Sequence, residues 1–340
     1  MTLSRKRFLA AGAGAGAFAS VGILRWPGEA AQFTFKLAND QTPTHPMNVH
    51  TAEAVKRIAD ASGGQIEVKV FPSSILGSDP QMLAQVRTGA TEMVQIGNNI
   101  LGSVIPSATL LTMPFAFTGA QQFQTAANGP LGGYIGSAGA KIGMRKFDTA
   151  FYGGFFEVQN RVRPINGPAD LKGLKIRVPP GPIDVGTFKA FDAAPTVITL
   201  SEVYTSLQTH LIDGLEVPLP TFHNFKFYEQ TKYCSLTHHS GLAYMLFVNA
   251  DAWQRLPKNL QDILDREFGA AAAAASKSMT AQEVSVEAAL TTLGVVFNRP
   301  ALEPFSQVIR SKGLYRGWRD QYDPSGQGWE MLEKTTGKLV

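Results

Sequence analysis

Residues 62–96 read SGGQIEVKVFPSSILGSDPQMLAQVRTGATEMVQI and decide the fold class of this 340-residue chain. Residues 66–70 alternate apolar and polar side chains, which predicts a strand. The next segment places Met82, Leu83 and Val86 on one helical face and is expected to end at Gly89. Residues 93–96 then predict a second strand. A strand–helix–strand unit of this kind favours an open α/β sheet.

The same alternation continues on both sides of this unit. Further strands are expected over residues 33–37, 174–178, 196–199 and 244–249, and further helices from Ala52 to Ala59 and over residues 184–191. One more helix is predicted to begin at Ser201 as its cap and to bury Val203, Leu207 and Leu211.

A long helical pattern runs from Pro257 to about Leu293 without another proline. At 1.5 Å per residue such a helix would be about 50 Å long, which exceeds one small domain, so we expect it to lie across two. The alternative is two helices broken near Gly269. The expected architecture is two α/β lobes with a cleft between them, as in closing binding proteins.

The N-terminus has the features of an export signal. Three basic residues, Arg5 to Arg7, precede an apolar run from Phe8 to Leu24, and small residues follow around Ala30. We expect cleavage after Ala30. The alternative is a retained anchor, for which the run is short and rich in Gly and Ala. Residues 4–9 also resemble the twin-arginine export signal, with Lys6 replacing one arginine, so both export routes stay open.

Composition excludes several classes of function. Residues 1–30 hold four basic groups and one acidic group, so the formal charge falls from +4 to +1 without them and does not favour nucleic-acid binding. The single cysteine, Cys234, excludes an intramolecular disulfide. No nucleophile elbow, phosphate loop or zinc-ligand spacing is present after the leader, so we expect neither an enzyme, a cofactor nor a bound metal.

Several segments together resemble the DctP-type solute receptors of TRAP (tripartite ATP-independent periplasmic) transporters. They include residues 62–72, 75–77, 111–117, 171–179, 193–195, 201–209 and 212–218. The resemblance covers nearly the whole mature chain in order. It implies a periplasmic-binding-protein-like fold, a small-molecule ligand and a membrane-embedded permease as partner. The lobes are expected to comprise residues 31–154 plus 243–282 and residues 155–242 plus 283–340, after a signal peptide over residues 1–30.

The resemblance places the carboxylate-binding arginine of the family at Arg177. A guanidinium can hold a carboxylate through two parallel hydrogen bonds. Its predicted position at the carboxyl end of a strand also suits a ligand, because such ends face the crevice of an open α/β sheet. A structural ion pair at the surface is the alternative role.

Two departures from the family pattern bear on the ligand. Many acid-binding members carry a second arginine at the position of Glu157 and an asparagine at that of Val217. An acidic group there would repel a second carboxylate, which favours a monocarboxylate over a dicarboxylate. Alternatively, Glu157 pairs with Arg161 or Arg163 as plain structure.

Other polar and aromatic residues follow predicted strands and are weaker candidates for ligand contact. They are His45, Asn98, Asn99, Tyr152, Phe155, Phe156, Phe222 and His223. The predicted function is a monomeric periplasmic receptor that delivers a small organic acid to a TRAP permease. A receptor for an amine-bearing or non-carboxylate solute that uses Glu157 is the alternative within the binding class, and an exported hydrolase is the alternative outside it.

Overall fold

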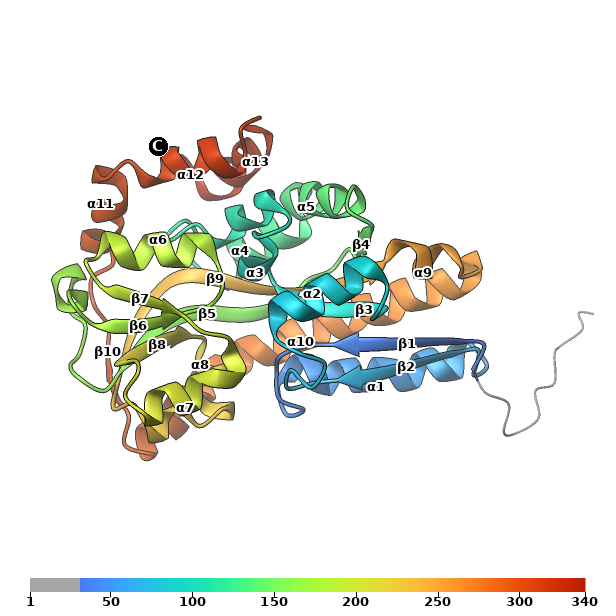
Figure 1. Ribbon diagram of the computed structural model, residues 1–340, viewed down its shortest axis with the longest axis horizontal. Helices are drawn as coiled ribbons and strands as arrows, with labels where there is room; N and C mark the ends of the chain where they lie inside the picture. Colours follow the sequence, from blue (N-terminus) through green and yellow to red (C-terminus); the bar gives the residue numbers. More distant parts are fainter. Residues whose placement is uncertain (1–30, 340) are drawn as a thin grey trace, which may run out of the picture.

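The computed structural model describes residues 31–339 and places the strands of this part of the chain in one sheet between helical layers (Figure 1). The strands are β1 (Phe33–Ala38), β2 (Ile66–Phe71), β3 (Met93–Gly97), β4 (Met144–Lys146), β5 (Phe151–Asn160), β6 (Lys175–Val178), β7 (Ala194–Val197), β8 (Gly214–Val217), β9 (Tyr233–Asn249) and β10 (Val296–Asn298).

The α-helices are α1 (Pro46–Ala61), α2 (Asp79–Thr88), α3 (Asn98–Leu101), α4 (Ala120–Asn128), α5 (Pro130–Ala140), α6 (Pro182–Ala190), α7 (Val203–Gln208), α8 (Leu219–Asn224), α9 (Ala250–Gln254), α10 (Lys258–Thr292), α11 (Glu303–Ser311), α12 (Leu314–Tyr322) and α13 (Gln327–Thr336). Short 3₁₀ helices are η1 (Pro106–Thr112), η2 (Pro168–Leu171), η3 (Leu200–Glu202) and η4 (Phe227–Glu229).

Two groups of strands form the two halves of the sheet. The order is β2-β1-β3-β9-β5-β8-β6-β7, with β4 and β10 both paired to β9. Pairing is parallel within β2-β1-β3 and within β8-β6-β7, whereas β9 and β5 pair antiparallel to their neighbours in this order. This arrangement confirms the predicted two-lobed α/β fold.

Three long elements connect the halves. The strands β5 and β9 run from one group of strands to the other, and α10 extends beneath both (Figure 1). The helix α10 is continuous over 35 residues, so the alternative of a break near Gly269 is wrong. The residue boundaries proposed for the lobes stay a prediction, and the proposed signal peptide at residues 1–30 lies outside the described residues.

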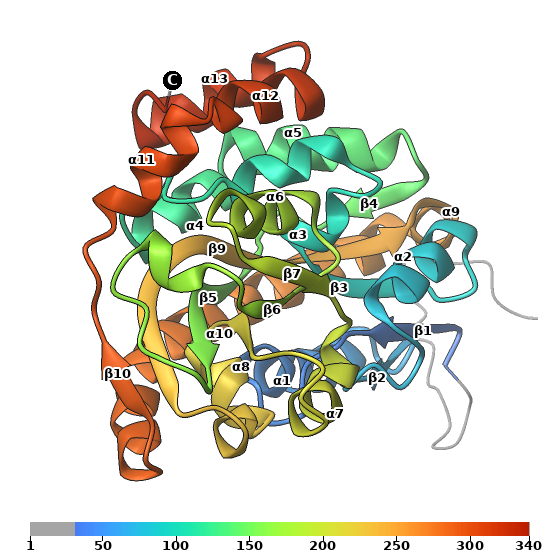
Figure 2. The same ribbon diagram turned by 60° about the vertical axis from the view of Figure 1, so that its left-hand side comes forward.

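The hydrophobic core has three parts, of which the first extends along both halves of the sheet and the other two each belong to one half. One part lies between the sheet and the layer of α2, α4, α5, α6 and the C-terminal helices. A second packs α1 and the first half of α10 against the strands β1 to β3. The third encloses α7, α8 and the end of α10. Figure 2 shows α11 to α13 lying over α4, α5 and α6, so the end of the chain covers elements from both halves.

Several local predictions are wrong in detail. Leu211 was expected in a helical core stripe, yet its side chain is 57% exposed because α7 already ends at Gln208. Ser201 lies inside η3 and does not cap α7. The strand expected over residues 244–249 in fact begins at Tyr233. The prediction missed its first half because His238, His239 and Gly241 interrupt the apolar pattern there.

A close contact between α4 and α5 requires a residue without a side chain. A Cβ atom built on Gly132 would lie 1.9 Å from the carbonyl oxygen of Ala127, whereas one on Gly133 would contact nothing within 4 Å. We expect Gly132→Ala to lower the free energy of unfolding by about 2 kcal/mol, because the two helices must move apart. The matched control, Gly133→Ala, should raise it by about 0.5 kcal/mol. Urea unfolding of both variants tests this; equal effects would contradict it.

Within residues 31–339, the structure contains no helix with the length and apolar character needed to cross a bilayer.

Candidate functional site

A cavity lies where the carboxyl ends of strands from both halves of the sheet meet. Its walls come from the segments after β1, β3, β6 and β8, from the start of α2, and from the middle of β5 and β9. This is the crevice in which open α/β sheets bind ligands. The lining residues are Asp40, Gln41, Asp79, Gly97, Asn99, Ile100, Phe156, Arg177, Pro179, Leu200, Val217, Pro218, Thr221, Leu242 and Tyr244.

Among the described residues, the cavity lining contains one strongly basic group, Arg177, near the end of β6. Its side chain is 2% exposed, and its Nε–H donates to the carbonyl oxygen of Ile198 at 2.7 Å. That bond fixes the plane of the guanidinium. Within the described part of the chain, no carboxylate lies within 4.0 Å of the Arg177 nitrogens. Burial lowers the pKa of Arg177, and nearby Glu216 and Asp79 partly offset this effect. The other guanidinium nitrogens are therefore available to a ligand anion.

Two carboxyl groups line the same cavity. Asp79 is the first residue of α2 and only 5% exposed, and burial raises its pKa to about 6 although Arg177 acts in the opposite direction. Asp40 follows β1 and accepts a hydrogen bond from Gln41 Nε2 at 3.2 Å. Burial and the Asp79 charge both raise the pKa of Asp40. The cavity thus combines one cation with two acids.

A buried acid–imidazole pair lies close to Arg177. Glu216 on β8 approaches His239 Nε2 on β9 at 2.5 Å, and Thr237 Oγ1 lies 2.7 Å from His239 Nδ1. Burial raises the pKa of Glu216 to about 8, with Arg177 opposing, and lowers the pKa of His239 to about 3. Burial therefore favours the uncharged form of both groups.

This pair predicts how stability depends on pH. In the folded protein Glu216 keeps its proton up to about pH 8, but in the unfolded chain it loses it above about pH 4.5. His45 and His239 have pKa values of about 3 in the folded protein and 6.5 in the unfolded chain. Their titration makes the free energy of unfolding rise with pH, but only below pH 6.5. We therefore expect the free energy of unfolding to fall between pH 6.5 and 8.

Urea unfolding at both pH values, followed by tryptophan fluorescence, measures this decrease. The isosteric variant Glu216→Gln carries no titrating proton at this position, so its stability should fall less over the same range. Equal decreases in the two proteins would contradict this assignment.

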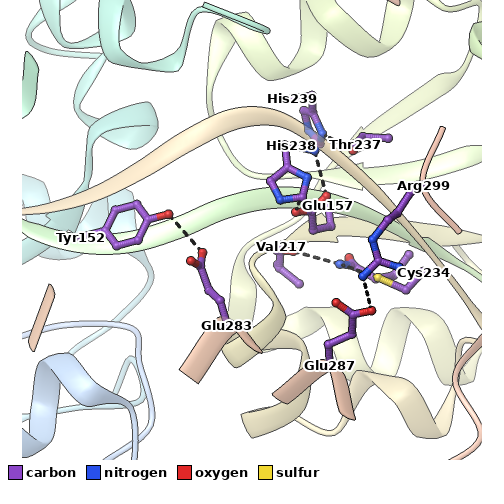
Figure 3. A network of polar contacts seen from close by, with 11 residues as sticks. Tyr152, Glu157, Val217, Cys234, Thr237, His238, His239, Glu283, Glu287 and Arg299 are labelled. Atoms are coloured by element: carbon purple, nitrogen blue, oxygen red, sulfur yellow. Dashed lines mark hydrogen bonds and ion pairs between the residues drawn. The ribbon is translucent and has the colours of Figure 1, made fainter. Parts of the chain in front are cut away.

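Glu157 lies outside the cavity lining. Its Oε2 accepts the backbone N–H of His238 at 2.9 Å, and its Oε1 lies 3.3 Å from His238 Nδ1 (Figure 3). Burial raises the pKa of Glu157. The alternative pairing with Arg161 or Arg163 is wrong, because both guanidinium groups donate instead to backbone carbonyl oxygens.

The remaining predicted residues divide between the cavity wall and the core. Arg177, Val217, Phe156 and Asn99 line the cavity, and Val217 is paired with Glu157 in the sheet. The others occupy structural positions or a separate surface depression: His45, Asn98, Tyr152, Phe155, Phe222 and His223.

Each structural position has its own partner. His45 caps α1 by accepting the N–H of Met47, and its ring contacts that of Tyr244 edge-on. Asn98 accepts the N–H of Ala243 at 2.8 Å. Tyr152 donates its hydroxyl hydrogen to Glu283 (Figure 3), and Phe222 is fully buried.

Sequence reasoning missed most polar residues of the cavity. Asp40 and Gln41 come shortly after the first predicted strand, so the strand-end argument used for Arg177 could have found them. Asp79 resembled an ordinary first-turn acidic residue of a helix. Thr221 and Tyr244 carried no local signal. Among residues 31–339, no three His, Cys, Asp or Glu side chains are arranged to hold a metal ion.

Comparison with known proteins identifies the family. Residues 37–315 match the model of the bacterial extracellular solute-binding proteins, family 7 (DctP). The chain belongs to this family. Its members and structural relatives are solute receptors of TRAP transporters that act with membrane permeases, so the enzyme alternative is wrong.

Individual relatives agree with this assignment. The sialic acid-binding periplasmic protein SiaP of Vibrio cholerae is 31% identical over 262 residues, which are 76% of this chain and 81% of SiaP. The 2,3-diketo-L-gulonate-binding periplasmic protein YiaO of Escherichia coli is 32% identical over 61% of this chain and 63% of its own. A TRAP solute-binding protein of Xanthobacter autotrophicus, solved with β-D-galacturonate, superposes with a TM-score of 0.83 at 26% identity, covering 89% of this chain and 99% of that protein.

Proposed function

We propose that this DctP-family receptor captures a small organic monocarboxylate in the periplasm and delivers it to the permease of a TRAP transporter. The observation that carries the proposal is the position of Arg177. Its guanidinium is buried at the end of a parallel strand, its plane is fixed by Ile198, and it faces a cavity formed by both halves of the sheet. Such a group binds a carboxylate through two charge-assisted hydrogen bonds.

The preference for one carboxylate follows from the rest of the lining. Among the described residues that form the cavity wall, Arg177 is the only lysine or arginine, whereas Asp40 and Asp79 are acidic. A second ligand carboxylate would have no cation to bind and would be repelled by these acids. The apolar side chains of Phe156, Leu200 and Leu242 line the same cavity and would contact the carbon skeleton of a ligand. Among the similar proteins, the sialic acid of SiaP and the galacturonate of the Xanthobacter protein carry one carboxylate each, whereas a structural neighbour from Sulfurospirillum deleyianum was solved with the dicarboxylate succinate.

The geometry also supports capture by closure. Cavity residues come from both groups of strands, so a ligand that bridges Arg177 on one side and Asp79 on the other would hold the halves together. We include in the proposal an export signal cleaved after Ala30 and a monomeric receptor in solution.

Calorimetric titration of the mature protein with a panel of monocarboxylates and dicarboxylates of equal chain length tests the proposal. Before titration, unfolding and refolding should remove any solute that has been purified with the protein. We expect at least one monocarboxylate to bind and its dicarboxylate counterpart to bind less tightly. A preference for dicarboxylates, or no binding of any acid, would refute the proposal.

The alternative of an amine-bearing solute recognised by Glu157 has no support from the geometry. The Glu157 carboxylate is occupied by His238 and does not line the cavity.

A further inference from the structure

Acidic groups outnumber basic groups around Arg177, and this excess of acids indicates a second group that the ligand carries. Arg177 interacts electrostatically with four carboxyl groups, those of Asp40, Asp79, Asp184 and Glu216. Glu216 is paired with His239, and Asp184 accepts a hydrogen bond from Asn99. Only Asp40 and Asp79 belong to the cavity wall. A ligand carboxylate on Arg177 would neutralise the single cation and leave these two acids without a countercharge.

Asp79 is the carboxyl group of the cavity wall on which the inference depends. Only 5% of its surface is exposed, and it lines the cavity. Within the described residues its carboxylate makes no hydrogen bond and no ion pair. The capping contacts at the start of α2 are made by Ser78 and Gln81 instead. Buried ionised groups without a partner are costly, so such an arrangement persists where a ligand supplies the missing charge or hydrogen bonds.

We propose that the ligand is zwitterionic: its carboxylate binds Arg177 and a cationic amine binds between Asp79 and Asp40. This inference rests on the proposed function and adds the second recognised group of the ligand. A hydroxyl group would supply hydrogen bonds but no charge, so the two acids would have to take up a proton when a hydroxy acid binds. An ammonium group satisfies both requirements with its three donors.

An amine-bearing ligand was the alternative predicted from the sequence. The structure favours such a ligand with Asp79, not Glu157, as the recognition residue. Glu157 is held by His238, whereas the Asp79 carboxylate has no hydrogen-bond or ion-pair partner among residues 31–339. Asp79 and Asp40 would be specificity-determining residues, because they contact the part of the ligand that distinguishes an amino acid from a hydroxy acid of the same skeleton.

Matched pairs of ligands test the inference on the mature protein. Monocarboxylates of the same skeleton would be compared with an amino and with a hydroxyl group, for example 4-aminobutyrate with 4-hydroxybutyrate and 2-amino-2-deoxygluconate with gluconate. We expect the best-bound amino member to bind about 30-fold more tightly than its hydroxyl counterpart, and N-acetylation to remove this advantage. Titration in two buffers of different ionisation enthalpy should show proton uptake with the hydroxy acid and less with the amino acid.

Two variants assign the effect to Asp79. Asp79→Asn should abolish the preference for the amine. Glu216→Gln removes a carboxyl group near Arg177 that does not line the cavity, so it should keep the preference. Thermal unfolding confirms that both variants fold; if Asp79→Asn does not, Asp40→Asn tests the same acid pair.

The outcomes also separate the two proposals. If hydroxy acids bind as tightly as their amino counterparts, or if Asp79→Asn keeps the preference, the zwitterion inference is wrong and the monocarboxylate function stands. If no monocarboxylate of either kind binds, the proposed function itself is refuted and this inference fails with it.

Discussion

Replacing Arg177 by methionine is expected to weaken the binding of the best monocarboxylate by about 1,000-fold, corresponding to about 4 kcal/mol. The guanidinium is the single basic group among the described residues of the cavity wall, and Ile198 holds it in a fixed plane. Methionine fills a similar volume without charge or donors. The loss should appear as faster dissociation, because a buried charge pair affects the bound state more than the encounter.

Arg177→Lys separates charge from geometry. Lysine keeps the positive charge but lacks the planar fork that binds both carboxylate oxygens, so its affinity should lie between those of the wild type and the methionine variant. Calorimetric titration measures all three proteins, with a circular-dichroism spectrum of each as the control for folding. If Arg177→Met binds its ligand as tightly as the wild type, the carboxylate is held elsewhere.

A proline in the middle of α10 should have the largest effect on stability. Ala273→Pro is expected to lower the free energy of unfolding by about 3 kcal/mol or more, because proline removes a helical hydrogen bond and clashes with the preceding turn. Ala273 is exposed, so the change leaves the core contacts of Ala272 and Ala275 in place and tests the backbone alone. Because α10 extends along both halves of the sheet, we also expect the variant to lose affinity for ligand.

The matched control is Ala273→Gly, which keeps the hydrogen bond and should cost only about 1 kcal/mol. Urea unfolding of the three proteins under the same conditions provides the comparison. If proline and glycine have equal effects, the helix is not continuous at this position in solution.

The fold was predictable from local patterns wherever one face of an element is buried. Strict alternation over residues 66–70 and the stop at Gly89 both correspond to the structure, in which Gly89 has a left-handed φ of 78°. The pattern failed where burial and local sequence disagree. Most of the first half of β9 is buried despite its polar residues, because His239 contacts Glu216, Ser240 donates to the carbonyl oxygen of Thr112, and Thr237 contacts the ring of His239.

The candidate site was predictable only in part, for a related reason. Arg177 could be placed because it follows a recognisable strand. Asp79 and Tyr244 line the same cavity, yet each lies more than 60 residues from Arg177 in the sequence and from the other. Only the folded sheet brings the three residues together. Glu157 shows the converse: its sequence position suggested the pocket, but a bulge between Phe156 and Val158 accompanies its contact with the His238 backbone.

The long strand β9 has a consequence for biosynthesis. It pairs with β3 in one half of the sheet and with β5 in the other, and both of these strands precede it in the chain by more than 70 residues. Neither half can therefore be completed while the ribosome is still translating the first 230 codons. A fragment that ends before Tyr233 would present the unpaired edges of β3 and β5 to other chains, and we expect it to aggregate instead of folding as an independent lobe.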